Sequence, residues 1–128
     1  MRKISVRTAA REQMVDITRQ VQQAVQDGGG ADGVVTVFCP HTTAAVTINE
    51  NADPDVQRDV LAYLGRLIPR EAGFRHAEGN SDSHIKTVLT GPSVQVIVEG
   101  GTLMLGTWQG IYLCEFDGPR NREVWIYT

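Results

Sequence analysis

The sequence predicts a single α+β domain over residues 1–128, with a mostly antiparallel sheet and helices that cover one face of it. The chain is the size of one ordinary domain, and 41% of its residues are hydrophobic, which is enough for a core. Helical and strand-like segments mix in the first part, whereas everything after residue 92 is strand-like. No repeat, linker or low-complexity tract divides the chain.

The first elements are a strand and a helix. Residues 3–9 alternate polar and apolar side chains, as in a half-buried strand. Apolar residues then recur at helical spacing from Ile17 to Val25, and Asp16 or Thr18 can cap this helix. Three glycines from Gly28 onward end it.

Two strands and the clearest helix follow. Residues 33–40 and 42–50 are rich in β-branched side chains and are predicted to be adjacent strands with a bend between them. The helix over residues 54–68 has Asp53 as its N-cap, an apolar stripe and Pro69 as its end.

A loop over residues 70–80 leads to a short helix and then to strands. The helix is predicted from residue 81 to 90, with Ile85, Val88 and Leu89 facing inward. Strands are predicted over the remaining apolar runs, which are residues 93–99, 102–116 and 122–128.

Charge and motifs exclude several classes of protein. The net charge is −3 without a block of like charges, so neither nucleic acid nor a membrane is an expected partner. No apolar run is long enough to span a bilayer, and no phosphate-binding glycine motif or nucleophile elbow is present. Cys39 and Cys114 lie in apolar runs and are expected to be buried, reduced thiols in a cytoplasmic protein.

Ionisable residues crowd into FRHAEGNSDSHIK, which contains His76 and His84. Asn80 and His84 are four positions apart and can share a helix face. A helix start also presents unpaired N–H groups that favour an anion such as phosphate. Imidazoles are common metal ligands, but this spacing matches no established metal motif. One surface histidine and one hydrogen-bonded histidine remain the alternative.

Two further clusters carry polar chemistry. His41 begins HTTAAVTINENADPD, in which Glu50 is either a solvated side chain or a general base or cation ligand. In LGTWQGIYLCEFDGPRNR, core packing is the favoured interpretation of Trp108, and Gln109 needs a partner if it is buried. The arginines after the turn suit phosphate or carboxylate, with surface ion pairs as the alternative.

These stretches together resemble the YjbQ-like family of small bacterial and archaeal proteins. The matching motifs are HTTAAVTINENADPDV, HAEGNSDSHIKTVLTG and LGTWQGIYLCEFDGPR, and the resemblance covers almost the whole chain. It implies a β-sandwich-like core with two longer helices and one short helix, and assembly as a homotrimer. It also implies secondary thiamine-phosphate synthase activity, which joins an aminopyrimidine pyrophosphate to a thiazole phosphate and releases pyrophosphate.

The resemblance carries a candidate site over to this chain. Its metal ligands would be His41, His76 and His84. Its catalytic residues would be His41, Glu50, Glu78 and Lys86. Its substrate-binding residues would be Gln109 and Arg120, and the polar clusters themselves add Asn49, Asn80 and Arg122 as candidates for the same role.

The metal and the role of this site have alternatives. Pyrophosphate chemistry usually uses Mg²⁺ held by carboxylates, whereas three imidazoles suit Zn²⁺ better. A non-catalytic trimer that binds a metal or a small phosphorylated ligand is therefore the alternative function. A structural trimer, whose polar residues serve only the subunit interfaces, is the third interpretation.

Overall fold

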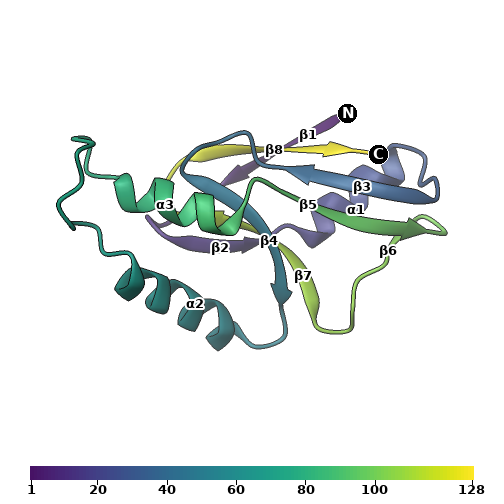
Figure 1. The fold of residues 1–128 in the computed structure, drawn as a ribbon. Coiled ribbons are helices and arrows are strands. Elements are labelled where there is room, and N and C mark those ends of the chain that lie inside the picture. The colour runs from purple at the N-terminus through teal and green to yellow at the C-terminus, as the bar shows by residue number, and fades with distance from the viewer.

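The computed structural model describes residues 1–128 and contains eight strands and three helices (Figure 1). In chain order the elements are β1 (Arg2–Arg7), β2 (Gln13–Asp16), α1 (Thr18–Asp27), β3 (Gly33–Phe38), β4 (Ala44–Glu50), α2 (Pro54–Leu67), α3 (Ser81–Thr90), β5 (Ser93–Glu99), β6 (Thr102–Leu103), β7 (Gln109–Glu115) and β8 (Asn121–Tyr127). None of the helices is long and apolar enough to cross a membrane.

The strands form two sheets, and every pair of neighbouring strands is antiparallel. The larger sheet has the order β1-β8-β3-β5-β6, and the smaller has the order β2-β7-β4. Because β1 and β8 are paired, the two termini lie side by side (Figure 1). The predicted α+β class and the mostly antiparallel pairing are confirmed.

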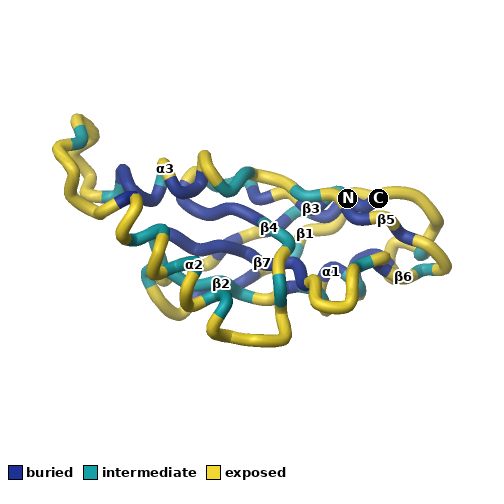
Figure 2. The backbone as a smooth tube through the Cα atoms, turned by 60° about the horizontal axis from the view of Figure 1, so that its bottom comes forward, coloured by how far each residue is buried: buried dark blue, intermediate teal, exposed yellow.

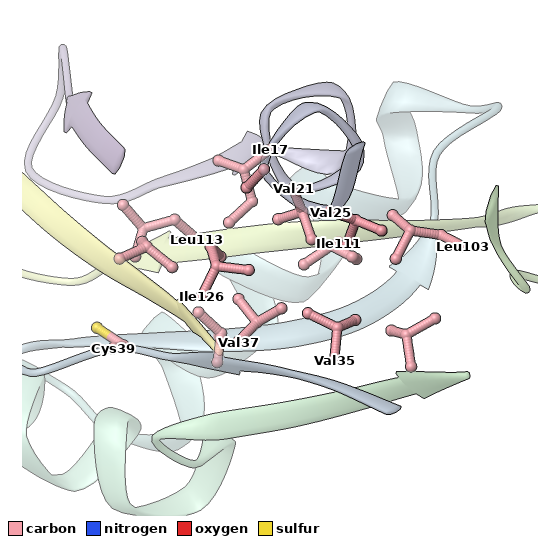
Figure 3. Packing of buried hydrophobic residues seen from close by; sticks show 14 of the residues in the cluster. Ile17, Val21, Val25, Val35, Val37, Cys39, Leu103, Ile111, Leu113 and Ile126 are labelled. Carbon is pink, nitrogen blue, oxygen red and sulfur yellow. The ribbon is translucent and has the colours of Figure 1, made fainter. Parts of the chain in front are cut away.

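The main hydrophobic core lies between α1, the smaller sheet and the larger sheet. Val21 and Val25 of α1 point into it from one side, and Val35 and Val37 of β3 reach it from the other (Figure 3). Ile111 of β7 lies in the same core and is fully buried. Alternate residues of β3 point inward because side chains of a strand alternate between its two faces.

Both cysteines are buried and free, as expected. Burial raises the pKa of Cys39 to about 11 and that of Cys114 to about 12. The thiols are therefore protonated near neutral pH, which makes them inert as nucleophiles.

Three strand predictions need correction. β3 and β4 are not neighbours, because β3 pairs with β5 and β8 while β4 pairs with β7. The chain crosses between the sheets around Pro40, which cannot donate a ladder hydrogen bond. The predicted strand over residues 102–116 is two strands, β6 and β7, separated by a loop. β2 was not predicted, since four residues give too short a pattern.

α2 begins and ends as predicted but packs loosely. Asp53 accepts a hydrogen bond from the backbone N–H of Asp55, and the helix ends at Leu67. None of its residues is fully buried, and Tyr63 and Leu67 are each 61% exposed. The helix accordingly appears in exposed and intermediate colours along its length (Figure 2). Its apolar stripe therefore covers little of the core in a single chain.

The side of α3 that faces inward is the opposite of the one predicted. Val88 is 81% exposed and Leu89 is 61% exposed, whereas Asp82 is fully buried and Lys86 is 1% exposed. The side of the helix that faces the sheets is polar, because ion pairs hold it there. We call the residues of these pairs the α3 ion-pair network: Arg11, Glu12, Asp82 and Lys86.

Each charge in the α3 ion-pair network has an opposite partner. Lys86 Nζ lies 3.1 Å from Asp82 Oδ2 and 3.0 Å from Glu12 Oε1. Arg11 donates to both carboxylate oxygens of Asp82, at 3.2 and 3.3 Å. The neighbouring Ser83 hydroxyl donates to the carbonyl of Phe116 at 2.5 Å. A buried ion needs such partners, since removal of one leaves an uncompensated charge.

We expect Asp82→Asn to lower the free energy of unfolding by about 3–5 kcal/mol at pH 7, because Lys86 would keep its charge and lose its most buried partner. Urea unfolding followed by circular dichroism measures this change. The matched control is Asp55→Asn, which breaks the exposed pair with Arg58 and should cost about 1 kcal/mol or less. Equal effects of the two substitutions would contradict a stabilising role for the network.

The same pair predicts a pH dependence. Burial favours a raised pKa for Asp82, but hydrogen bonds from Arg11 and Lys86 outweigh it, so the pKa lies below the usual 3.8. The stability contributed by this carboxylate is therefore present above pH 3.8 and lost as the pH falls through the lower folded-state pKa. The difference between the wild type and Asp82→Asn should narrow in urea titrations repeated at progressively lower pH.

Candidate functional site

The loop before α3 and the first turn of α3 bring two of the three histidines together. The ring centroids of His76 and His84 are 5.4 Å apart, and the planes meet edge to face at 81°. His76 Nε2 also lies 3.8 Å from Glu78 Oε2. The His76 side chain is 43% exposed, so a ligand can reach the pair from solvent. We call these two side chains the histidine pair.

Asn80 and Arg120 lie at the same end of α3 as the histidine pair. Asn80 Nδ2 donates to Asp117 Oδ2 at 2.8 Å, and Arg120 donates to the same oxygen at 3.0 Å. The Arg120 side chain remains 53% exposed, so its guanidinium can also meet an anion. This end of the molecule therefore combines two imidazoles, an amide and an accessible arginine.

His41 has a different environment. Its Nε2 accepts a hydrogen bond from the backbone N–H of Glu123 in β8 at 3.0 Å. Burial and the nearby charge of Arg122 lower the pKa of this imidazole, which favours its neutral form. No three histidine, cysteine or acidic side chains of the chain converge in a way that could hold a metal ion. The expected three-imidazole centre does not form within one chain.

Lys86 and Arg122, both predicted to belong to the site, lie in buried ion pairs. Lys86 belongs to the α3 ion-pair network. Arg122 Nε donates to Glu115 Oε1 at 2.9 Å, and its Nη2 donates to the Thr43 hydroxyl at 2.9 Å. Both cations are at most 5% exposed. In one chain these contacts give them a structural role and leave no access to a substrate.

A second group of candidate residues lies where β4 ends and β7 begins. Glu50 is paired with Gln109 in the register of these strands, and Asn49 is paired with Gly110. The Glu50 carbonyl accepts a hydrogen bond from the Tyr112 hydroxyl at 3.0 Å. Gln109 finds its partner locally, since its side-chain oxygen accepts from Gly106 N at 2.8 Å.

Trp108 lies at the surface, so the favoured interpretation of this residue as part of the core is wrong. Its side chain is 63% exposed, and its carbonyl accepts a hydrogen bond from Asn51 N. The loop holds the indole at the surface because the chain must turn between β6 and β7 there. The aromatic ring is therefore available at the Glu50 end of the smaller sheet.

The two groups of candidate residues lie at opposite ends of the smaller sheet. α3 is fixed near Phe116 and Asp117, just beyond the position where Glu115 pairs with Ala44. Glu50 lies six residues further along β4, which at about 3.4 Å per residue is a distance of ~20 Å. Within one chain the histidine pair and Glu50 cannot contact the same small ligand.

Several residues of these polar networks were not among the sequence-based candidates. Asp82 is fully buried, and its spacing of four residues from Lys86 was the available signal for a helical ion pair. Arg11 and Glu12 had no signal, because they are about 70 residues away in the sequence. The sequence also gave no signal for the burial of Glu115, since a charged residue at the end of an apolar run is typical of a solvent-exposed strand end.

Comparisons with known proteins agree over the whole chain. A family model described as UPF0047 protein YjbQ-like matches residues 2–128. The UPF0047 protein YugU of Bacillus subtilis is 50% identical over 127 residues, which cover 98% of this chain and 96% of the relative. The UPF0047 protein MJ1081 of Methanocaldococcus jannaschii is 48% identical and covers 97% of this chain and 90% of the relative.

Solved structures show the same architecture. A conserved YjbQ/UPF0047 family protein from Clostridium acetobutylicum superposes with a TM-score of 0.97 at 53% identity, covering 99% of this chain and 98% of that one. The conserved hypothetical protein TT1486 from Thermus thermophilus gives a TM-score of 0.94 at 45% identity, covering 100% and 99%. The fold and the sequence therefore place this chain in the YjbQ-like UPF0047 family.

Proposed function

We propose that this protein binds phosphorylated small molecules at the histidine pair and joins an aminopyrimidine pyrophosphate to a thiazole phosphate. The resemblance to secondary thiamine-phosphate synthases suggests the reaction. The observation that carries the proposal is the approach of His76 and His84 to one another at the start of α3. Arg120, exposed at the same end of that helix, adds a permanent positive charge.

The reaction needs few groups from the protein. The thiazole nitrogen attacks the methylene carbon of the pyrimidine, a C–N bond forms, and the C–O bond to pyrophosphate breaks. The leaving group takes the electron pair of that bond, so negative charge develops on its oxygens. Imidazole N–H groups and a guanidinium stabilise such charge when they are aligned in advance. In this proposal the histidine pair and Arg120 provide those donors.

We expect His84→Ala to lower turnover of the two substrates by about 10²-fold, the usual cost of removing one aligned donor. Release of pyrophosphate and formation of thiamine phosphate are measured together, and circular dichroism verifies the fold. The matched control is Arg19→Ala, an exposed side chain on α1 that should leave turnover unchanged. Full activity in a folded His84→Ala variant would rule out this site for the reaction.

We also propose that the protein is a homotrimer in the cytoplasm. The outward side of α3 and the loosely packed α2 together expose Tyr63, Leu67, Val88 and Leu89. A groove of about 230 Å³ with mostly apolar walls lies between these helices and the smaller sheet. Exposed apolar side chains next to an apolar groove are typical of an interaction site. Assembly would also let the Glu50 group of one chain approach the histidine pair of another.

Val88→Asp tests the assembly, because it places a charge at the most exposed apolar position of α3. We expect the wild type to sediment at three times its chain mass of 14.0 kDa and the variant to sediment as a folded monomer. Arg19→Asp, which changes the charge of α1 instead, should remain trimeric. A monomeric wild type at micromolar concentration would contradict the proposal.

Metal binding without catalysis is a second candidate function. An open zinc site uses three protein ligands, whereas the histidine pair supplies two, so a complete centre does not fit a single chain. The observation that favours the candidate is the access of solvent to both neighbouring imidazoles. A third ligand for zinc would have to come from another subunit, and Glu78 is a carboxylate beside the pair that Mg²⁺ could use.

Zinc binding is measured by the shift in thermal midpoint on addition of Zn²⁺. We expect a rise for the wild type and none for His84→Ala, since a ligand that binds only the folded state stabilises it. His41→Ala should keep the rise if His41 remains bound to β8, and should lose it if that imidazole completes the centre from a neighbouring chain. No rise in the wild type would rule out metal binding as the second candidate function.

A further inference from the structure

Asp117 contacts two residues of the candidate site, although the proposed reaction assigns it no role. Its Oδ2 accepts a hydrogen bond from Asn80 Nδ2 at 2.8 Å and another from Arg120 Nη2 at 3.0 Å. The Asp117 side chain is only 16% exposed, whereas that of Arg120 is 53% exposed. The carboxylate therefore lies beneath the arginine and faces the interior of the site more than the solvent.

The guanidinium of Arg120 is held by two bonds to this one residue. Its Nε donates to the Asp117 carbonyl at 2.7 Å, and its Nη2 donates to the Asp117 carboxylate. A planar guanidinium that is bonded at two of its nitrogens has a fixed orientation. The third nitrogen, Nη1, bonds to no other group of the chain and remains a donor for a ligand.

The turn that carries Asp117 and Arg120 is itself anchored at both ends. The N–H of Asp117 donates to Glu115 Oε2 at 3.1 Å. The N–H of Arg120 donates to the Thr8 hydroxyl at 2.9 Å, and its carbonyl accepts from the Thr8 N–H at 2.9 Å. Both anchoring residues are buried. The position of the carboxylate is therefore set by the buried part of the molecule.

Asn80 connects the same carboxylate to α3. A carboxylate only accepts hydrogen bonds, so it fixes which end of the Asn80 amide faces it. The backbone carbonyl of Asn80 accepts in turn from the His84 N–H at 3.3 Å. Asp117 thus links the arginine of the turn between β7 and β8 to the first turn of the helix that carries His84.

We propose that Asp117 is the positioning residue of the candidate site, which holds Arg120 and the start of α3 in the one arrangement that meets a pyrophosphate group. The inference rests on the proposed function, because it concerns the donors assigned there. Donors that are oriented in advance lose less freedom when an anion binds. Asp117 acts through its neighbours and does not touch the ligand.

Position and charge have opposite effects at this residue, so they can be separated. The negative charge of Asp117 by itself repels an anion, whereas its hydrogen bonds orient the donors. Both side-chain bonds go to the single oxygen Oδ2, so the amide oxygen of Asp117→Asn can accept them while the charge is lost. Asp117→Glu keeps the charge but displaces the carboxylate by one methylene group. Asp117→Ala removes both.

Inorganic pyrophosphate is the probe, titrated into the ¹⁵N-labelled protein at constant ionic strength while the backbone amide resonances are followed. We expect Asp117→Ala and Asp117→Glu to bind it about tenfold more weakly than the wild type, because Arg120 would have to be ordered on binding. Asp117→Asn should bind at least as tightly as the wild type. Circular dichroism verifies the fold of each variant.

The matched control is Asp55→Ala, which removes an aspartate–arginine pair of the same spacing and the same 3.0 Å length from the exposed surface of α2. It should leave pyrophosphate affinity unchanged. Wild-type affinity in Asp117→Glu, or binding by Asp117→Asn as weak as by Asp117→Ala, would overturn the proposal. Absence of saturable binding by the wild type at tens of millimolar pyrophosphate would overturn it as well.

The positioning role and the proposed reaction can fail separately. The expected order of pyrophosphate affinities without any turnover of the pyrimidine and thiazole substrates would support the positioning role and remove the reaction. Turnover by Asp117→Glu with unchanged kcat and KM would support the reaction and remove the positioning role.

Discussion

The buried charges under α3 are the constraint on which the rest of the structure depends. Asp82 and Lys86 have almost no contact with solvent, so each must keep its partners, and those partners are anchored in the segment just before β2. This requirement fixes the rotation of the helix about its axis. It turns Val88 and Leu89 outward and sets His84 beside the loop that carries His76. Ion pairs, more than hydrophobic burial, therefore decide where the candidate site faces.

Sequence patterns predicted the fold where they reflect local physics. The cap at Asp53 and the start of α2 were correct because a short side chain that bonds a helix N–H acts within a few residues. The inward side of α3 was predicted incorrectly, because its partners Arg11 and Glu12 are distant in the sequence. An apolar stripe indicates a covered surface but not what covers it. The sheet assignment of β3 and β4 failed for a similar reason, since a bend at Pro40 is compatible with a hairpin or a crossing between sheets.

The sequence predicted which types of residue form the candidate site better than it predicted where they lie in space. The crowding of His76 and His84 in one short segment did correspond to proximity in space. The motif around Glu50 is equally polar, but six residues of β4 separate it from the start of α3. Spacing along a strand gives a distance only once the register is known, so the sequence could not divide the candidates into two groups. Burial of Arg122 against Glu115 was hidden for the same reason.

The loop over residues 70–79 has a consequence for how this protein can change over time. It is largely exposed and contributes no side chain to either hydrophobic cluster, yet it carries His76 of the histidine pair. Substitutions, insertions and deletions in such a segment leave the packing of the sheets intact. Ligand preference can thus diversify among descendants while the scaffold beneath it stays the same.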